Sequence, residues 1–312
     1  MRDDFLWVES YRPKTVSDTI LPEELKQTFQ QFVNQENIPN LILSGSAGVG
    51  KTTIAKAMLE ELECDYITIN GSMNGNIDTL RNYIQQFASS VSLQGGRKYV
   101  ILDEADYLNA NSTQPALRNF MEEYAKNCGF ILTCNFKNRI IEPLHSRCSV
   151  IDFKLDKKDR LDLAAQMFKR ACMILKKENI KFDKAAVVEV VKKYFPDNRR
   201  ILNELQRYSV SGAIDTGILS NVREISLSKL VKSLKDKNFT EVRKWVAENS
   251  DTDSADIFRK IYDKSSSFVS SNSVPQLVLI LAEYQFKAAH VADQEINLTA
   301  CLVEIMANIQ FT

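Results

Sequence analysis

A glycine-rich segment at residues 45–52 contains the residue types best suited to chemistry. It reads Gly-Ser-Ala-Gly-Val-Gly-Lys-Thr and fits the pattern G-x-x-x-x-G-K-[ST] at every position. In this pattern backbone N–H groups surround phosphate oxygens, the lysine (Lys51) reaches the β- and γ-phosphates, and the threonine (Thr52) binds Mg²⁺. An apolar run at 41–43 precedes the segment and a helical pattern at 54–62 follows it. This context favours a phosphate-binding loop over a glycine-rich turn that matches by chance.

Two carboxylates follow another apolar run, at residues 99–102. A buried strand that ends in Asp103 and Glu104 would place the first at the metal and the second where it polarises a water for in-line attack. A solvated acidic turn after a strand is the alternative interpretation. Because the phosphate loop is present in the same chain, the two motifs together predict a nucleoside triphosphatase that uses Mg²⁺.

Strands and helices alternate in the first half of the chain and could position these residues. Short apolar runs lie at 41–43, 66–69, 99–102, 130–133 and 150–153, separated by helical patterns. This order predicts a parallel five-stranded α/β sheet of the P-loop NTPase class. Open α/β sheets bind ligands at the carboxyl ends of their strands, where both motifs are expected.

The pattern changes after residue 154. Amphipathic helices are predicted at 159–178, 183–194 and 197–208, and the chain is entirely helical from residue 226 onward. We therefore predict three domains: a nucleotide-binding α/β domain over 1–154, a small helical lid over 155–222 and an all-α domain over 226–312.

Composition excludes several classes of protein. The 312 residues are 44% hydrophobic and 26% charged, and 40 basic residues balance 40 acidic ones, so bulk charge does not drive nucleic-acid binding. No apolar run approaches the roughly 18–20 residues of a membrane span. Six scattered cysteines without a CxxC pair argue against a zinc site and for free thiols. We expect a cytoplasmic protein, in the host cytoplasm if the source is a virus, with no membrane partner.

Three further segments indicate a family. They are Trp-Val-Glu-Ser-Tyr-Arg-Pro-Lys at 7–14, Thr-Cys-Asn at 133–135 and Ser-Arg-Cys at 146–148. In this order they resemble the AAA+ clamp-loader ATPases, the replication factor C group and its phage counterparts, along essentially the whole chain. The segment 194–219 is most similar to the large subunits of T-even-type bacteriophage clamp loaders. The letters Asp-Glu-Ala-Asp at 103–106 also occur in a large helicase class.

The resemblance implies roles for individual residues. Lys51 and Glu104 match catalytic residues, Asn135 matches the first sensor, and Arg199 matches the second sensor on the lid. Arg147 matches the arginine finger, which acts on the ATP of a neighbouring subunit. The residues that match the family's nucleotide site are Val8, Glu9, Ser10, Tyr11, Arg12, Ile20, Ala47, Gly48, Val49, Gly50, Lys51, Thr52, Thr53 and Arg199, with Thr52 and Asp103 at Mg²⁺.

Partners also follow from the resemblance. It implies other copies of the chain in an open ring or spiral, a clamp-loader small subunit, a sliding clamp and primer–template DNA. Arg81 and Arg118 match DNA-facing positions, although Asn119 stands where the family often has a second arginine. The all-α domain matches the collar that holds subunits in a ring. Its apolar stripes could form an interface or an intrachain core; their residues are Leu277, Leu281, Tyr284, Leu298, Leu302 and Ile305.

The predicted function is that of an ATP-hydrolysing clamp-loader subunit. ATP binding would drive opening of the clamp and binding of primer–template DNA, and DNA-triggered hydrolysis would release the closed clamp for the replicative polymerase. A P-loop DNA helicase or translocase is an alternative, but no second strand series follows residue 154. A cellular replication factor C small subunit and a non-catalytic scaffold are further alternatives. The presence of Glu104 argues against the scaffold.

Overall fold

The computed structural model describes residues 6–73, 77–92, 95–210, 212–214, 227–249, 254–288 and 290–312. The chain divides into two compact units, Met1–Val222 and Arg223–Thr312, which are described separately.

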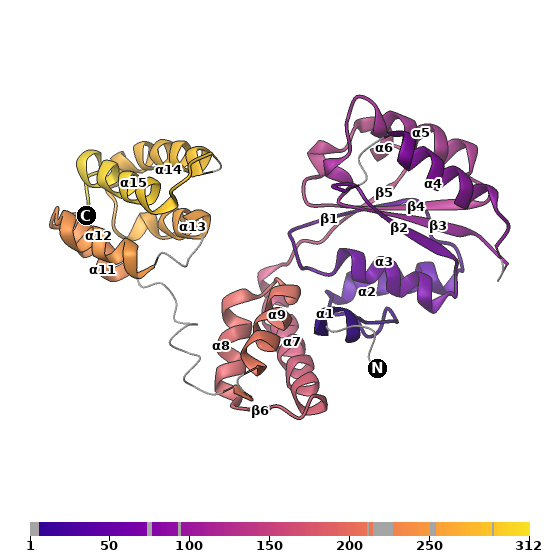
Figure 1. Ribbon diagram of the computed structural model, residues 1–312, viewed down its shortest axis with the longest axis horizontal. Helices are drawn as coiled ribbons and strands as arrows, with labels where there is room; N and C mark the ends of the chain where they lie inside the picture. Colours follow the sequence, from indigo (N-terminus) through magenta and orange to yellow (C-terminus); the bar gives the residue numbers. More distant parts are fainter. Residues whose placement is uncertain are drawn as a thin grey trace. The chain divides into compact units, whose positions relative to one another are not determined.

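A parallel sheet forms the centre of the first unit (Figure 1). Its strands are β1 (Leu41–Ser44), β2 (Tyr66–Asn70), β3 (Lys98–Asp103), β4 (Cys128–Cys134) and β5 (Ser149–Asp152), in the order β2-β3-β4-β1-β5. The predicted five-stranded parallel sheet is confirmed. Because β1 and β3 both pair with β4, the loops that leave their carboxyl ends meet at one edge of the sheet.

Helices cover both faces of the sheet (Figure 1). On one face lie α2 (Glu23–Asn34) and α3 (Lys51–Glu61), and on the other lie α4 (Ile77–Ser89), α5 (Thr113–Glu123) and the short α6 (Glu142–His145). Side chains alternate along each strand. In β3, Tyr99 and Ile101 pack with α2 and α3, whereas Val100 and Leu102 pack with α4 and α5. Burial on both faces explains why the sequences of β1, β3 and β4 contain continuous apolar runs.

Three helices follow the sheet within the first unit. They are α7 (Lys157–Lys177), α8 (Lys184–Tyr194) and α9 (Asn198–Ser209), each within a few residues of its predicted bounds. The short helix α1 (Trp7–Ser10) joins them, since the Trp7 ring is buried in their core and its backbone N–H donates to Gln206 Oε1 at 3.0 Å. A small parallel pair of strands, β6 (Lys181–Phe182) and β7 (Ala213–Ile214), was not predicted.

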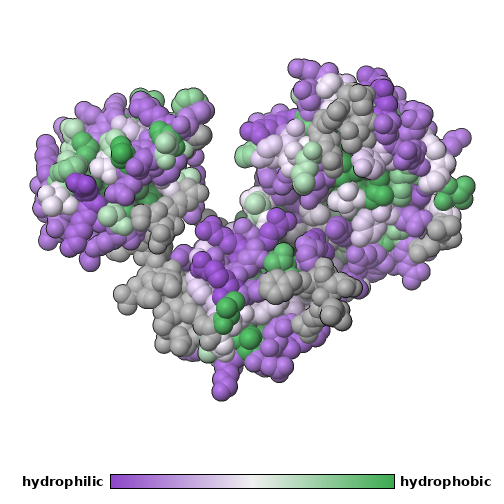
Figure 2. Space-filling view, viewed as in Figure 1, coloured by the Kyte–Doolittle hydropathy of each residue, from purple (hydrophilic) through white to green (hydrophobic). Residues whose placement is uncertain are grey.

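The described part of the second unit is helical, as predicted. It contains α11 (Leu227–Lys235), α12 (Phe239–Glu248), α13 (Ser254–Lys264), α14 (Val274–Ala288) and α15 (Gln294–Asn308). All six residues of the predicted apolar stripes lie in its core. Helix α14 also carries apolar residues outward, with Leu279 66% and Phe286 72% exposed. Figure 2 shows apolar patches on an otherwise largely hydrophilic face of this unit. None of the helices described is long and apolar enough to span a membrane.

Candidate active site

The phosphate loop connects β1 to α3 and depends on two glycines with positive φ. Gly48 has φ +71° and Gly50 has φ +99°, a region that favours glycine. A Cβ atom on Gly48 would lie 1.8 Å from Asp197 Oδ1. The backbone N–H of Asn198 donates to the Gly48 carbonyl at 3.1 Å. The start of α9 therefore lies directly against the phosphate loop, and only glycine leaves room for it.

Lys51 is a buried cation whose partners are uncharged oxygens. Its side chain is 8% exposed, and Nζ donates to the carbonyls of Gly45 (2.8 Å) and Ser46 (2.7 Å) and to Asn135 Oδ1 (2.9 Å). Burial lowers the pKa of Lys51, and the nearby charge of Arg199 adds to this effect. An anion at this site would replace neutral partners with an opposite charge, which favours phosphate binding.

Thr52 and Asp103 share a hydrogen bond at the carboxyl ends of the strands. Thr52 Oγ1 donates to Asp103 Oδ1 at 2.6 Å, and Thr133 Oγ1 donates to the same oxygen at 2.6 Å. A hydroxyl and a carboxylate oxygen are ligands that Mg²⁺ accepts, together with waters and nucleotide phosphates. The described residues contain no cluster of three or more His, Cys, Asp or Glu side chains able to hold a metal. The donor set thus fits a cation shared with a nucleotide.

Glu104 follows β3 in a strained conformation. Its φ of +56° lies in the left-handed region, which is uncommon for a residue with a side chain and costs about 1–3 kcal/mol. The Glu104 N–H donates to Thr133 Oγ1 at 3.2 Å, which supports this turn from β4. Residues with strained backbone conformations are often found at functional sites. The half-buried Glu104 side chain lines the same pocket as Lys51.

Asp106 holds the end of β4 in place, a role that sequence reasoning missed. It is 5% exposed, and its Oδ2 accepts hydrogen bonds from the N–H groups of Asn135 and Phe136, each at 3.1 Å. Asn135 is therefore fixed through its backbone by Asp106 and through its side chain by Lys51. The only sequence feature that could have indicated this role is an acidic residue three positions after Asp103.

One pocket gathers most of the predicted nucleotide residues. Its lining includes Val8, Tyr11, Arg12, Ile20, Ala47, Gly48, Gly50, Lys51, Thr52, Thr53, Asp103, Glu104, Asn135 and Arg199. Glu9, Ser10 and Val49 do not line it; Glu9 instead pairs with Arg12 at 2.5 Å. The lining residues that were not predicted are Pro13, Thr19, Leu21, Thr133, Cys134, Met167, Arg170, Asn198 and Leu202.

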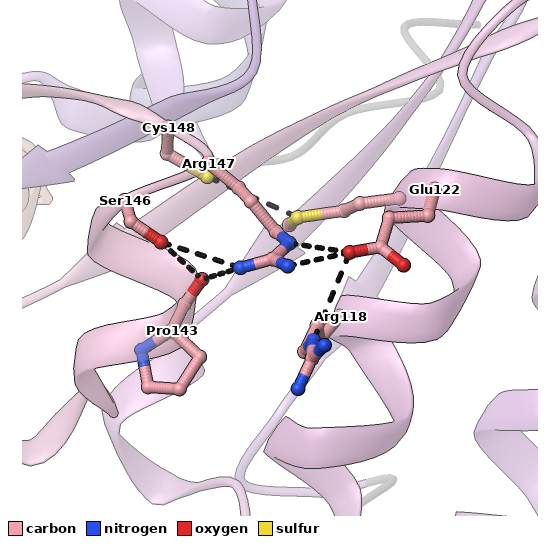
Figure 3. A network of polar contacts seen from close by, with 7 residues as sticks. Arg118, Glu122, Pro143, Ser146, Arg147 and Cys148 are labelled. Atoms are coloured by element: carbon pink, nitrogen blue, oxygen red, sulfur yellow. Dashed lines mark hydrogen bonds and ion pairs between the residues drawn. The ribbon is translucent and has the colours of Figure 1, made fainter.

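The remaining predicted residues lie outside the pocket lining. The Arg147 side chain is held by residues of its own chain (Figure 3). Its Nε and Nη2 donate to Glu122 Oε1 at 2.9 and 2.5 Å, and its Nη1 donates to the Pro143 carbonyl at 2.9 Å. Arg118 approaches the same Glu122 oxygen at 3.7 Å. Arg81, on α4, is exposed.

Comparisons with known proteins agree with this geometry. The AAA model, "ATPase family associated with various cellular activities", matches residues 41–155, and the model "Sliding-clamp-loader large subunit, AAA+ ATPase lid domain" matches 159–220. The sliding-clamp-loader large subunit of Enterobacteria phage T4 is 35% identical over 97% of this chain and 96% of its own length. The chain belongs to the sliding-clamp-loader family of AAA+ ATPases.

Other relatives of this clamp-loader chain span phages and archaea. The large subunit of Escherichia phage RB69 is 39% identical over 75% of each chain. The replication factor C small subunit of Archaeoglobus fulgidus is 33% identical over 95% of this chain and 96% of its own length. A RuvB structure from Thermotoga maritima matches with a TM-score of 0.55 over 72% of this chain and 79% of its own, but at 16% identity, which shows the AAA+ fold alone. The family membership makes the chain an ATPase.

Proposed function

We propose that this chain is an ATP-hydrolysing subunit of a sliding-clamp loader. The observation that carries the proposal is the contact between Lys51 and Asn135 at 2.9 Å, in a pocket that also contains the Thr52–Asp103 pair. This network ties the phosphate loop to the ends of two other strands. A γ-phosphate inserted between Lys51 and Asn135 would therefore change the relation of the loop to the sheet. Binding and loss of that phosphate would then alter the shape of the subunit.

The residues of the pocket and Arg147 have separate roles in the hydrolysis of ATP. Lys51 and the phosphate loop bind the phosphates, and Thr52 and Asp103 would hold Mg²⁺, which offsets phosphate charge when it is bound. Glu104 orients and polarises the attacking water. Asn135 contacts the γ-phosphate, and Arg199 brings the α9 helix to the nucleotide. Arg147 of a neighbouring copy stabilises the charge of the transferring phosphoryl group.

The partners are other copies of this chain in an open ring, a small subunit, a sliding clamp and primer–template DNA. The outward apolar side chains of α14, Val278, Leu279 and Phe286, support association through the second unit, since such residues favour protein–protein contacts. The exposed guanidinium groups of Arg81 and Arg118 support contacts with the DNA backbone. ATP binding would open the clamp, and hydrolysis triggered by DNA would release it.

Steady-state ATP hydrolysis tests the proposal at fixed salt concentration. The chain is assayed alone and then with its small subunit, clamp and primer–template DNA. We expect clamp and DNA together to raise turnover many-fold, and Lys51→Ala to abolish turnover. Rapid hydrolysis by the chain alone on single-stranded DNA, without a response to the clamp, would contradict the proposal and favour a translocating motor.

A further inference from the structure

The Arg147 guanidinium is fully engaged within its own subunit (Figure 3). Glu122, on α5, accepts from Nε and Nη2 through a single oxygen, Oε1. On the other side, Nη1 donates to the Pro143 carbonyl at 2.9 Å and to Ser146 Oγ at 3.3 Å. All three guanidinium nitrogens therefore have partners in the chain that carries them.

The Nε–Nη2 edge is one of the two edges of the guanidinium that can bind a phosphoryl group through two N–H groups. Arginine binds carboxylate and phosphate through parallel N–H groups along one edge of its fork. Glu122 occupies the Nε–Nη2 edge, and Pro143 and Ser146 accept hydrogen bonds from Nη1, which belongs to the other edge. A phosphate of a neighbouring subunit's nucleotide can then be bound through the Nε–Nη2 edge only after Glu122 has been displaced.

We propose that Glu122 is a positioning residue that restrains Arg147 until a neighbouring phosphoryl group displaces it. The inference rests on the proposed function, because it requires Arg147 to act in trans. The exchange replaces one anion by another on the same guanidinium. It leaves the contacts from Nη1 to Pro143 and Ser146 in place, so this nitrogen keeps its partners while the Nε–Nη2 edge exchanges one anion for another.

The strength of the contact suits a displaceable restraint. The Glu122 side chain is 54% exposed and that of Arg147 28% exposed, so water and salt screen their attraction. Arg147 and, more weakly, Arg118 lower the pKa of Glu122, which stays ionised at neutral pH. A phosphoryl group carries more negative charge than a carboxylate and can compete with it in the water-poor space between two subunits. A buried ion pair would instead resist exchange.

The test is ATP turnover of the assembled complex without DNA, for Glu122→Gln, Arg147→Ala and the double variant. Glutamine keeps the shape of the side chain and an acceptor oxygen but removes the charge. We expect Glu122→Gln to raise turnover about two- to five-fold, the range of a released exposed ion pair. The double variant should show no rise over Arg147→Ala. Affinity of the isolated chain for a fluorescent ATP analogue should be unchanged, because Glu122 does not line the pocket.

Glu123→Gln is the matched control, since it removes the carboxylate of the next residue of α5. The Glu123 side chain forms a hydrogen bond with Tyr124 and not with Arg147. It should leave turnover at the wild-type level. Unchanged or reduced turnover in Glu122→Gln overturns the restraint, as does an equal rise in the double variant. If Arg147→Ala alone retains wild-type turnover, the trans-acting role in the proposed function is wrong, and the restraint fails with it. Reduced turnover in both single variants would instead keep the finger and reject the restraint.

Discussion

The nucleotide pocket and the Arg147 region differ in how much of their chemistry one chain completes. In the pocket, Lys51 and Asp103 have partners from several elements, and the lysine is 8% exposed. At Arg147, the guanidinium is bound to an exposed carboxylate and lies outside the pocket lining. Under the proposed function, a single chain provides one nucleotide pocket and, through Arg147, contributes to the pocket of a neighbouring copy. Turnover should depend on assembly, whereas nucleotide binding should not.

Removal of the Arg147 side chain should produce the largest difference between the effects on turnover and on nucleotide binding. Arg147→Ala is expected to lower turnover of the assembled complex by about 10³-fold or more, the range typical of an arginine finger. Nucleotide affinity of the isolated chain should stay within two-fold of the wild type, because Arg147 does not line the pocket. Steady-state hydrolysis and fluorescence titration measure the two quantities.

Arg259→Ala is the control for Arg147→Ala. It removes an exposed arginine that pairs with Asp263 in the second unit. Its turnover should match the wild type. An equal loss of binding and turnover in Arg147→Ala would place that residue in its own chain's pocket and end the distinction between the two regions.

A methyl group on Gly48 should damage the pocket without affecting Arg147. In Gly48→Ala the new Cβ would lie 1.8 Å from Asp197 Oδ1, at a φ of +71°. Overpacking typically costs 1–3 kcal/mol, so we expect nucleotide affinity to fall by about ten-fold or more. Gly212→Ala is the matched control, since its φ is +85° but nothing lies within 4 Å of the added Cβ. Equal affinities for both variants would show that the contact between α9 and the loop is unimportant for binding.

The pH dependence of binding should reveal the buried charge of Lys51. Burial lowers its pKa and Arg199 lowers it further, whereas Cys134, Asp103 and Asp106 oppose the shift. In the nucleotide-free protein, burial of the charged lysine costs stability at pH values below the lowered pKa of Lys51. This cost is relieved as the pH rises from that pKa toward 10.5, because Lys51 is then neutral in the folded chain but still charged in the unfolded one. The free energy of unfolding therefore increases over this range. Affinity for ATP should change in the opposite direction, because neutral lysine does not attract phosphate.

A titration of ATP affinity from pH 7 to 10.5, the ordinary pKa of lysine, measures this effect. Above the pKa of Lys51, affinity should fall by up to about ten-fold per pH unit. Lys51→Arg keeps its charge throughout this range and should lose that slope. The same slope in both proteins would assign the pH dependence to another group.

The two apolar faces of α14 should respond differently to substitution. Leu281 is 5% exposed and Phe286 is 72% exposed. Leu281→Ala should destabilise the protein by about 2–5 kcal/mol, measured by urea denaturation. Phe286→Ser should change stability by no more than about 0.5 kcal/mol but weaken self-association several-fold in sedimentation equilibrium. Unchanged association in Phe286→Ser would exclude this face from the assembly interface.

Local patterns in the sequence were sufficient for the sheet, the phosphate loop and the carboxylates Asp103 and Glu104. The other predicted residues of the pocket lining came from the family resemblance; they are Val8, Tyr11, Arg12, Ile20, Asn135 and Arg199. The run that became β3 and the carboxylates after it are adjacent in the chain, and so are the phosphate loop and the helix that begins at Lys51. The roles of Thr133 and Asp106 could not be predicted in this way. Each depends on the pairing of β3 with β4, in which Leu102 lies opposite Leu132.

Other features could not be predicted because no local sequence pattern identifies them. Strands β6 and β7 have two residues each, which is too short for an alternating pattern. Helix α14 is apolar on both its buried and its exposed side, so its sequence predicted the stripe of Leu277, Leu281 and Tyr284 but could not decide whether this stripe forms an intrachain core or an interface. Pro143 and Ser146, two partners of Arg147, lie in and directly after α6. The third, Glu122, lies on α5, 25 residues before Arg147 in the sequence, and no local motif links the two.

The central claim is that each active site combines Lys51 of one copy with Arg147 of another. Mixing two inactive variants tests it most directly: Lys51→Ala and Arg147→Ala are assembled separately and then together, with the small subunit, clamp and DNA present. The claim predicts little turnover in each separate assembly and a clear recovery in the mixture, where Lys51 of one variant meets Arg147 of the other. If the mixture is no more active than its separate components, the two residues do not act across a subunit boundary.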